Sequence, residues 1–142
     1  TIDAAPGIGL AAPQVGVPHR IIVLDLVHES RGTEVIKLVN PVIRKAEGEV
    51  VFEEGCLSVV YFTAEVRRAE QVVVFGYDEK GDESEIEAEG LLAVALQHEI
   101  DHLDGKLFID RISRLKRDLY IRKLKKSIRT GKEMQENRGV VI

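Results

Sequence analysis

The pattern of apolar and polar positions divides the chain into two parts. In the first ninety residues, short β-branched runs recur between turn residues, and such runs predict strands. Examples are HRIIVLDLV, EVIKLVNPVI and GEVVFEEGCLSVVYF. The stretches AEVRRAEQVVVFGYD and ESEIEAE, joined by DEKGDE, predict an antiparallel hairpin. We therefore expect mostly antiparallel β-sheet here.

The hydrophobic period changes near residue 90. AEGLLAVALQHEIDHLDG consists of helix formers, and residues 91–96 are apolar on nearly all sides of a helix. This predicts a buried central helix that stops near Gly105. A second helix, rich in Lys and Arg, is expected within residues 112–131. The predicted fold class is α+β, with antiparallel β-sheets around the central buried helix and a basic helix near the C-terminal end.

Length and composition narrow the class of protein. A chain of 142 residues with 44% apolar and 31% charged residues suits one globular domain, residues 1–142. No apolar run approaches the ~20 residues of a membrane span, so no membrane partner is expected. A single cysteine, Cys56, excludes an internal disulfide framework. Residues 1–110 carry 9 Lys/Arg against 21 Asp/Glu, whereas residues 111–142 carry 11 against 3.

The segment QHEIDH, residues 97–102, contains the HExxH pattern of helical metal sites. Four residues apart, His98 and His102 lie on one helix face and can bind a single ion. Glu99 points about 100° away and can act as a general base on water that the ion activates. The alternative is a pair of surface histidines. However, the preceding helix is apolar all round, and burying unpartnered polar groups costs several kcal/mol, which favours a metal site.

A third ligand is needed. Phe108 stands where a metzincin has its third histidine, and Asp118, the only acid in RLKRDLYIRKLKKS, lies in a basic helix. Cys56 in EEGCLS remains, although a lone cysteine is also commonly a small buried hydrophobe. A Cys-His-His set leaves the open fourth position of a catalytic site. Thiolate and imidazoles suit Zn(II) or Fe(II), and the ligand set does not choose between them.

Three segments, GIGLAAPQ (7–14), EGCLS (54–58) and QHEIDH (97–102), resemble the three motifs of peptide deformylase in order and spacing. The resemblance implies removal of the N-formyl group from the formylmethionine of nascent polypeptides, with release of formate. It implies that Cys56, His98 and His102 are the metal ligands and that Glu99 is the general acid and base.

The resemblance also assigns residues around the substrate. It implies that the Gln14 side chain and the Leu57 backbone N–H stabilise the oxyanion. From the residues alone, Gln14 is a turn glutamine bonding its own loop. The residues placed around the peptide and its methionine pocket are Ile8, Gly9, Glu54, Gly55, Leu91 and Val94. For Leu91 and Val94, ordinary core positions are an open alternative.

Cofactor and partners follow from the same resemblance. It implies one divalent ion per chain, Fe(II) natively, with Zn(II), Ni(II) or Co(II) able to replace it. It implies a bacterial cytoplasmic protein, and an organellar origin stays open. The sequence does not decide between a monomer and a dimer. The basic helix is expected to contact the ribosome, and a solvated helix face explains its charge equally well. Its basic residues are Arg114, Lys116, Arg117, Arg122, Lys123, Lys125, Lys126 and Arg129.

Two departures from the family pattern keep other functions open. After EGCLSV the family commonly has Pro, whereas this chain has Val60, Tyr61, Phe62 and Thr63. Members also carry an N-terminal helix before the first motif, and we expect that helix to be missing here. The alternatives are a catalytically impaired, ribosome-associated binding module of the same fold and an HExxH metallopeptidase.

Overall fold

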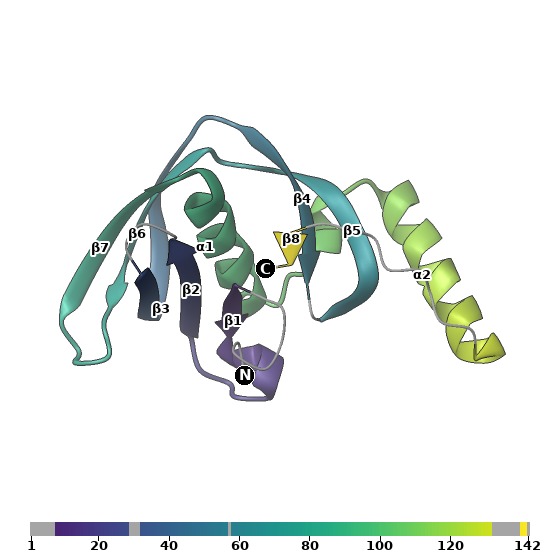
Figure 1. The fold of residues 1–142 in the computed structure, drawn as a ribbon, viewed down its shortest axis with the longest axis horizontal. Helices are drawn as coiled ribbons and strands as arrows, with labels where there is room; N and C mark the ends of the chain where they lie inside the picture. The colour runs from purple at the N-terminus through teal and green to yellow at the C-terminus, as the bar shows by residue number, and fades with distance from the viewer. Residues whose placement is uncertain (1–7, 29–31, 57, 132–139, 142) are drawn as a thin grey trace.

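The computed structural model describes residues 8–28, 32–56, 58–131 and 140–141. Two sheets face the central helix, with strand orders β1-β2-β3-β6-β7 and β5-β4-β8 (Figure 1). The strands are β1 (Gly9–Ala11), β2 (Ile21–His28), β3 (Gly32–Glu47), β4 (Val50–Cys56), β5 (Val59–Arg68), β6 (Gln71–Tyr77), β7 (Glu83–Glu89) and β8 (Val140–Val141). The helices are α1 (Gly90–Leu103) and α2 (Arg114–Thr130), with 3-10 turns η1 (Ala12–Val15) and η2 (Phe108–Arg111).

Antiparallel pairing dominates both sheets, as predicted. β2 pairs with β3, and β6 pairs with β7 as the expected hairpin. The Asp78 carboxylate stabilises the hairpin turn by accepting hydrogen bonds from the backbone N–H groups of Lys80 and Asp82, at 2.8 and 3.0 Å. The exception among the described strands is β8, which pairs in parallel with β4.

The expectation of one strand through residues 64–78 is wrong. The chain leaves the second sheet at Arg68 and enters the first at Gln71. Between them, Ala69 is held against α1: its N–H donates to Gln97 Oε1 at 3.0 Å, and its carbonyl accepts from Gln97 Nε2 at 2.9 Å. This contact with the helix fixes where the chain changes sheets.

The first sheet packs its inner face on α1, which is the buried central helix that the sequence predicts. The buried side chains of this core are Ala11, Ile22, Leu24, Leu38, Val72, Val74, Ala88, Ala93, Val94, Ala95, Leu96 and Ile100. Each large apolar side chain buried in this way contributes about 1.5–3 kcal/mol. The helix ends at Leu103, and Gly105 follows with a φ of +74°, a left-handed conformation that favours glycine.

A second core lies between the second sheet, η2 and α2. Its buried residues are Cys56, Val59, Ala64, Val66, Phe108, Ile109 and Tyr120. Phe62 packs on it, with its ring 4.4 Å from that of Tyr120 and 6.1 Å from that of Phe108. The segment that departs from the family pattern therefore supplies a core contact through Phe62.

Helix α2 begins at the predicted place, because the Ser113 side chain accepts a hydrogen bond from Lys116 N at 3.3 Å. Its one fully buried side chain is Tyr120, and the helix projects to one side of the molecule (Figure 1). Leu115 and Ile128 are 70% and 75% exposed. Over the described residues, no helix has the length and apolarity needed to cross a membrane.

Candidate metal centre

Cys56, at the end of β4, meets His98 and His102 of α1 in a buried cluster. The Sγ of Cys56 is 3.3 Å from Nε2 of His102, and that nitrogen is 3.2 Å from Nε2 of His98. The three donor atoms all lie within 4.8 Å of one another. Two nitrogens bound tetrahedrally to one ion at ~2.0–2.1 Å lie roughly 3.3 Å apart. The donor set and its spacing therefore fit a tetrahedral metal site.

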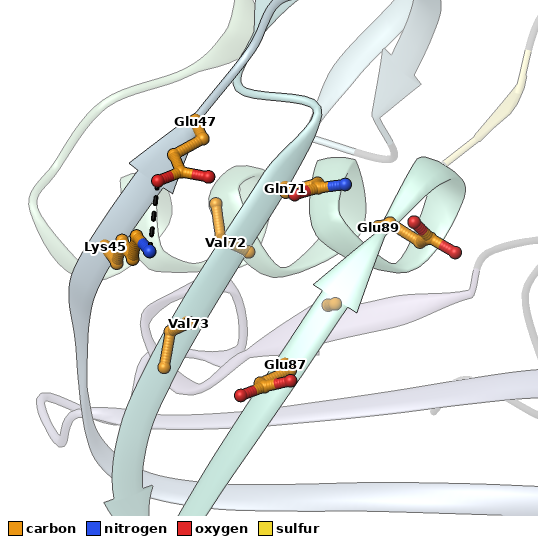
Figure 2. Close-up of a pocket in the computed structure, with 8 residues that line it drawn as sticks. Lys45, Glu47, Gln71, Val72, Val73, Glu87 and Glu89 are labelled. Carbon is orange, nitrogen blue, oxygen red and sulfur yellow. Dashed lines mark ion pairs between the residues drawn. The ribbon is translucent and has the colours of Figure 1, made fainter.

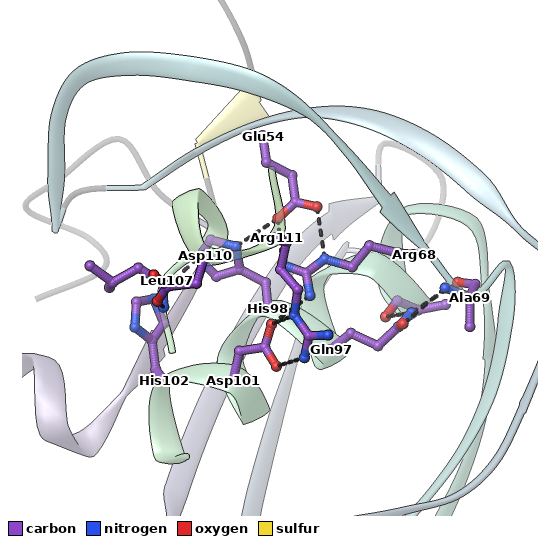
Figure 3. Close-up of polar contacts among 11 residues, drawn as sticks. Glu54, Arg68, Ala69, Gln97, His98, Asp101, His102, Leu107, Asp110 and Arg111 are labelled. Atoms are coloured by element: carbon purple, nitrogen blue, oxygen red, sulfur yellow. Dashed lines mark hydrogen bonds and ion pairs between the residues drawn. The ribbon is translucent and has the colours of Figure 1, made fainter. Parts of the chain in front are cut away.

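The ring of His98 is oriented by Glu54 (Figure 3). Its Nδ1 lies 2.8 Å from Oε1 of Glu54, and a carboxylate accepts, so Nδ1 carries the proton and Nε2 is free to bind an ion. Arg68 holds the other side of this carboxylate, donating from Nε at 2.8 Å and from Nη2 at 2.9 Å. Burial would raise the pKa of Glu54, but the hydrogen bonds and charges of Arg68 and His98 outweigh it and lower that pKa.

Asp101 extends the network to η2. It accepts from Arg68 Nη1 at 2.7 Å, and from Nε and Nη2 of Arg111 at 3.0 and 2.6 Å. These two arginines overcome the effect of burial and lower the pKa of Asp101. Figure 3 shows the chain of contacts running from Arg111 through Asp101 and Arg68 to Glu54.

Sequence reasoning missed the roles of Arg68, Asp101 and Arg111, and it placed Glu54 at the substrate. Both carboxylate oxygens of Glu54 are engaged by Arg68 and His98, so only its backbone remains for a peptide. One signal for Arg68 was present. Arg68 follows the buried residues Ala64 and Val66 at alternate positions of β5. Alternate residues of a strand face the same side, so a buried residue is expected at position 68.

Burial acts on the pKa values of His102 and Cys56 in opposite directions. It lowers the pKa of His102 to about 4, with a further contribution from His98, so the imidazole is neutral near pH 7. It raises the pKa of the Cys56 thiol. A metal ion reverses that effect, because it favours the thiolate.

Glu99 points toward β1 and is fully buried. Neither of its carboxylate oxygens has a hydrogen-bond partner within the described ranges. Burial raises its pKa to about 8. A Cβ built on Gly9 would lie 2.7 Å from Glu99 Oε1, so glycine alone leaves room for the carboxylate. An unpartnered buried carboxylate beside three metal-binding groups is explained if a cation and water belong there.

Gln14 combines the two roles weighed from the sequence. Its Oε1 accepts from the backbone N–H of Ala11 at 2.8 Å, which is the turn interaction. Its Nε2 faces the metal centre, 3.7 Å from Cys56 Sγ and 3.1 Å from Ser58 Oγ. The loop bond thereby orients the amide toward the metal ligands. Leu57, proposed as the second oxyanion donor, lies outside the described residues.

The remaining substrate positions are distributed around the centre. Ile8 is half-buried against the first core, next to Gly9. Val94 is fully buried in that core, which agrees with the core alternative, whereas Leu91 is half-buried. Gly55 is buried directly before Cys56.

The two downstream positions are not ligands. Phe108 is 1% exposed and stacks on His98 with ring centres 6.2 Å apart. Asp118 is exposed on α2, with a carboxylate oxygen 3.9 Å from Arg114 Nε. Both observations agree with the exclusion of Phe108 and Asp118 as the third ligand.

A pocket of about 440 Å³ lies elsewhere, along β3, β6 and β7 (Figure 2). It is lined by Lys45, Glu47, Gln71, Val72, Val73, Glu87, Ala88 and Glu89. Lys45 and Glu47 form an exposed ion pair at 3.0 Å. None of the lining residues belongs to the metal centre, where the three donor side chains and Glu99 lie together.

Comparisons with known proteins agree with this site. The sequence model of the family described as polypeptide deformylase matches residues 1–118. A peptide deformylase from Thermodesulfovibrio yellowstonii is 57% identical over 125 residues, covering 88% of this chain and 76% of the relative. The crystal structure of a peptide deformylase from Legionella pneumophila superimposes with a TM-score of 0.82 at 50% identity, covering 95% of this chain and 79% of that one. A structure from Ehrlichia chaffeensis, in complex with actinonin, gives 0.82 at 41% identity, covering 91% and 78%.

The Cys-His-His centre with a buried glutamate beside it, on an α+β fold, places this chain in the class of metal-dependent hydrolases. Within that class, the chain belongs to the polypeptide deformylase family. Its activity is hydrolytic removal of the N-formyl group from nascent polypeptides.

Proposed function

We propose that Cys56, His98 and His102 hold one divalent ion and that Glu99 and Gln14 act on a formylmethionyl peptide placed beside it. The observation that carries this assignment is the buried, unpartnered carboxylate of Glu99 next to three donor atoms within 4.8 Å of one another. A bound ion supplies Lewis acidity, which activates water near neutral pH and polarises a carbonyl oxygen.

Glu99 is the proposed proton carrier. Its carboxylate accepts a proton from the attacking water as the water oxygen bonds to the formyl carbon. The same proton then passes to the amide nitrogen while the carbon–nitrogen bond breaks. The immediate products are formic acid and a peptide with a neutral amino group. Near pH 7 the proton of the acid passes to the amine, which gives formate and an ammonium group, so atoms and charge balance without another reactant.

Gln14 is the proposed side-chain donor to the oxyanion of the tetrahedral intermediate. The bond from Ala11 N to Oε1 keeps Nε2 directed at the metal centre, where its N–H groups lie close to Cys56 Sγ and Ser58 Oγ. The Leu57 backbone N–H is the proposed second donor. Loss of one such preorganised donor typically costs about 2.7–4 kcal/mol of transition-state stabilisation.

The peptide is proposed to bind as an extended strand beside β1 and β4. The backbone of Ile8, Gly9, Glu54 and Gly55 would pair with it, with Leu91 and Val94 beside its methionine side chain. Structures of relatives from Ehrlichia chaffeensis and Synechococcus elongatus are described in complex with actinonin, which supports a ligand site in this fold.

Fe(II) is the proposed native ion, with Zn(II), Ni(II) or Co(II) as replacements. The mixed thiolate and imidazole donors suit all of these ions. Because a thiolate bound to Fe(II) is open to oxidation, activity of the iron form should decay in air and that of the Ni(II) form should persist.

The decisive experiment measures formate. Protein loaded anaerobically with Fe(II) or Ni(II), with one metal per chain verified, should release formate from formyl-Met-Ala-Ser and leave internal peptide bonds intact. Absence of formate from fully loaded protein would refute the assignment. Internal cleavage would instead support a metallopeptidase.

Residues 1–142 are proposed as one catalytic unit in the bacterial cytoplasm, with α2 as its contact to the ribosome. The helix carries eight Lys or Arg and one Asp, a balance of +7, and all eight basic residues are exposed. A dense row of cations on a projecting helix suits binding to RNA phosphates.

A further inference from the structure

The backbone of β4 is flanked on both sides directly before the metal ligand Cys56. On one side Glu54 and Gly55 pair with β5, and on the other they pair with Val140 and Val141 of β8. Figure 1 shows β8 beside β4, on the side toward α1. We call this second edge of Glu54–Gly55 the β4 edge. With β8 in place, the β4 edge is not available to another strand.

The direction of β8 determines what it can do there. β4 runs toward Cys56, and β8 is parallel to it, with Val140 opposite Glu54 and Val141 opposite Gly55. The amino end of β8 therefore points away from the metal ligands. A formylated peptide must start at the ligands and run away from them, which along this edge is the opposite direction. β8 therefore occupies the edge in the direction opposite to that of the proposed substrate.

We propose that Val140–Val141 is an internal competitor of the peptide substrate, which must displace this segment from the β4 edge before it can pair there. This rests on the proposed function, because it assumes that the substrate uses the edge beside Cys56. The occupant is the chain's own segment, since the pairing lies within one chain. A segment tethered to the same molecule competes at a high effective concentration, so a two-residue strand is sufficient to compete.

Competition of this kind acts on the apparent affinity for substrate. If the segment holds the edge for two-thirds to nine-tenths of the time, the apparent KM is raised ~3–10-fold, because only the open fraction binds. Once the peptide has replaced the segment, the catalytic groups are unchanged. The signature is a change in KM at constant kcat.

Proline substitution tests the pairing in the 142-residue chain. Val140→Pro combined with Val141→Pro removes both N–H donors from β8, whereas Val140→Ala with Val141→Ala keeps them. Relative to the alanine pair, the proline pair should lower KM for formyl-Met-Ala-Ser ~3–10-fold with kcat unchanged. Hydrogen exchange should also become faster at whichever of the Glu54 and Gly55 amides faces β8, while the other amide, which faces β5, should exchange at an unchanged rate.

Three results would overturn the proposal. Equal KM values and equal exchange in the proline and alanine pairs would mean that β8 does not hold the edge. Faster exchange at an unchanged KM would mean that it does not compete with substrate. A lower kcat would mean that β8 supports the site. If no variant released formate, the proposed function would fail, while the exchange measurement would still report whether β8 covers β4.

Discussion

The buried ionisable residues carry the chemistry of this protein at the scale of single side chains. Glu54, Glu99 and Asp101 are all buried, yet only Glu99 lacks a hydrogen-bond partner among the described residues. Arginines hold the pKa values of the other two low, whereas burial raises that of Glu99 to about 8. The paired carboxylates are positioned to orient ligands, and the unpaired one is available to exchange protons.

Glu99→Gln should keep the metal and lose turnover. The amide is nearly isosteric with the carboxylate but cannot accept a proton, so kcat should fall ~10²–10⁴-fold. Metal content by atomic spectroscopy should stay at one ion per chain. The matched control is Glu87→Gln, an exposed position of β7, which should leave both quantities unchanged. Near-normal kcat in Glu99→Gln would assign the proton transfer to another group.

Arg68→Met should weaken both folding and metal binding. The change leaves Glu54 and Asp101 without their buried partner, and breaking such a pair costs about 3–5 kcal/mol of unfolding free energy. Because Glu54 then orients His98 less well, metal affinity should fall ~10–100-fold in chelator competition. Arg68→Lys keeps the charge without the bidentate geometry and should be intermediate.

The neighbouring residue provides the control. Arg67 is 76% exposed and pairs with Glu49 at 3.2 Å. Arg67→Met should therefore change the unfolding free energy by under about 1 kcal/mol and leave metal affinity intact. Equal metal affinity in Arg67→Met and Arg68→Met would show that the Arg68 network does not orient His98.

At the scale of elements, β1 matters because its backbone lies against the carboxylate of α1. A Cβ on Gly9 would stand 2.7 Å from Glu99 Oε1 and 2.6 Å from Leu24 Cδ2. Gly9→Ala should therefore displace Glu99 and lower kcat, with losses of up to ~10²-fold expected for a shift of about 1 Å. Metal content should be retained. Unchanged kinetics in a correctly folded variant would mean that the carboxylate does not act from this position.

Helix α2 is separable from the chemistry, because it touches the rest of the fold mainly through Tyr120, Ile121 and Leu124. Arg122→Glu with Lys126→Glu replaces two exposed cations with anions. Cosedimentation with ribosomes should decrease ~10-fold or more and should depend less steeply on salt. Formate release from a short peptide should stay constant. Unaltered cosedimentation would assign the basic face to solvation alone.

At the scale of the whole molecule, the metal centre joins two cores. Cys56 belongs to the second core, while His98 and His102 lie on the helix that packs against the first sheet. Metal should therefore stabilise the entire fold, by about 2.7 kcal/mol at a free concentration 100 times the Kd. Chelation should lower Tm in thermal unfolding. In Cys56→Ala, added metal should have a much smaller effect on Tm, and an equal effect would exclude Cys56 as a ligand.

The elements were largely predictable because their signals are local. A run of helix formers that ends near Gly105 locates the first helix, a run rich in Lys and Arg within residues 112–131 locates the second, and β-branched runs locate the strands. The change of sheet between Arg68 and Gln71 was not predictable, because apolar alternation looks the same on either side of it. The role of Glu54 was missed for a related reason. Its partners Arg68 and His98 lie 14 and 44 residues away in sequence.

By itself, the sequence determined the types of metal ligand, their order and the helix that presents two of them. Residue chemistry and helical spacing are local properties, and the absence of a suitable downstream residue left Cys56 as the third donor. Only the tertiary structure decided how those groups are tuned. Burial leaves Glu99 without a partner, Arg68 fixes Glu54 against His98, and β8 closes the β4 edge. These features depend on desolvation and on contacts between distant segments, which a local pattern does not contain.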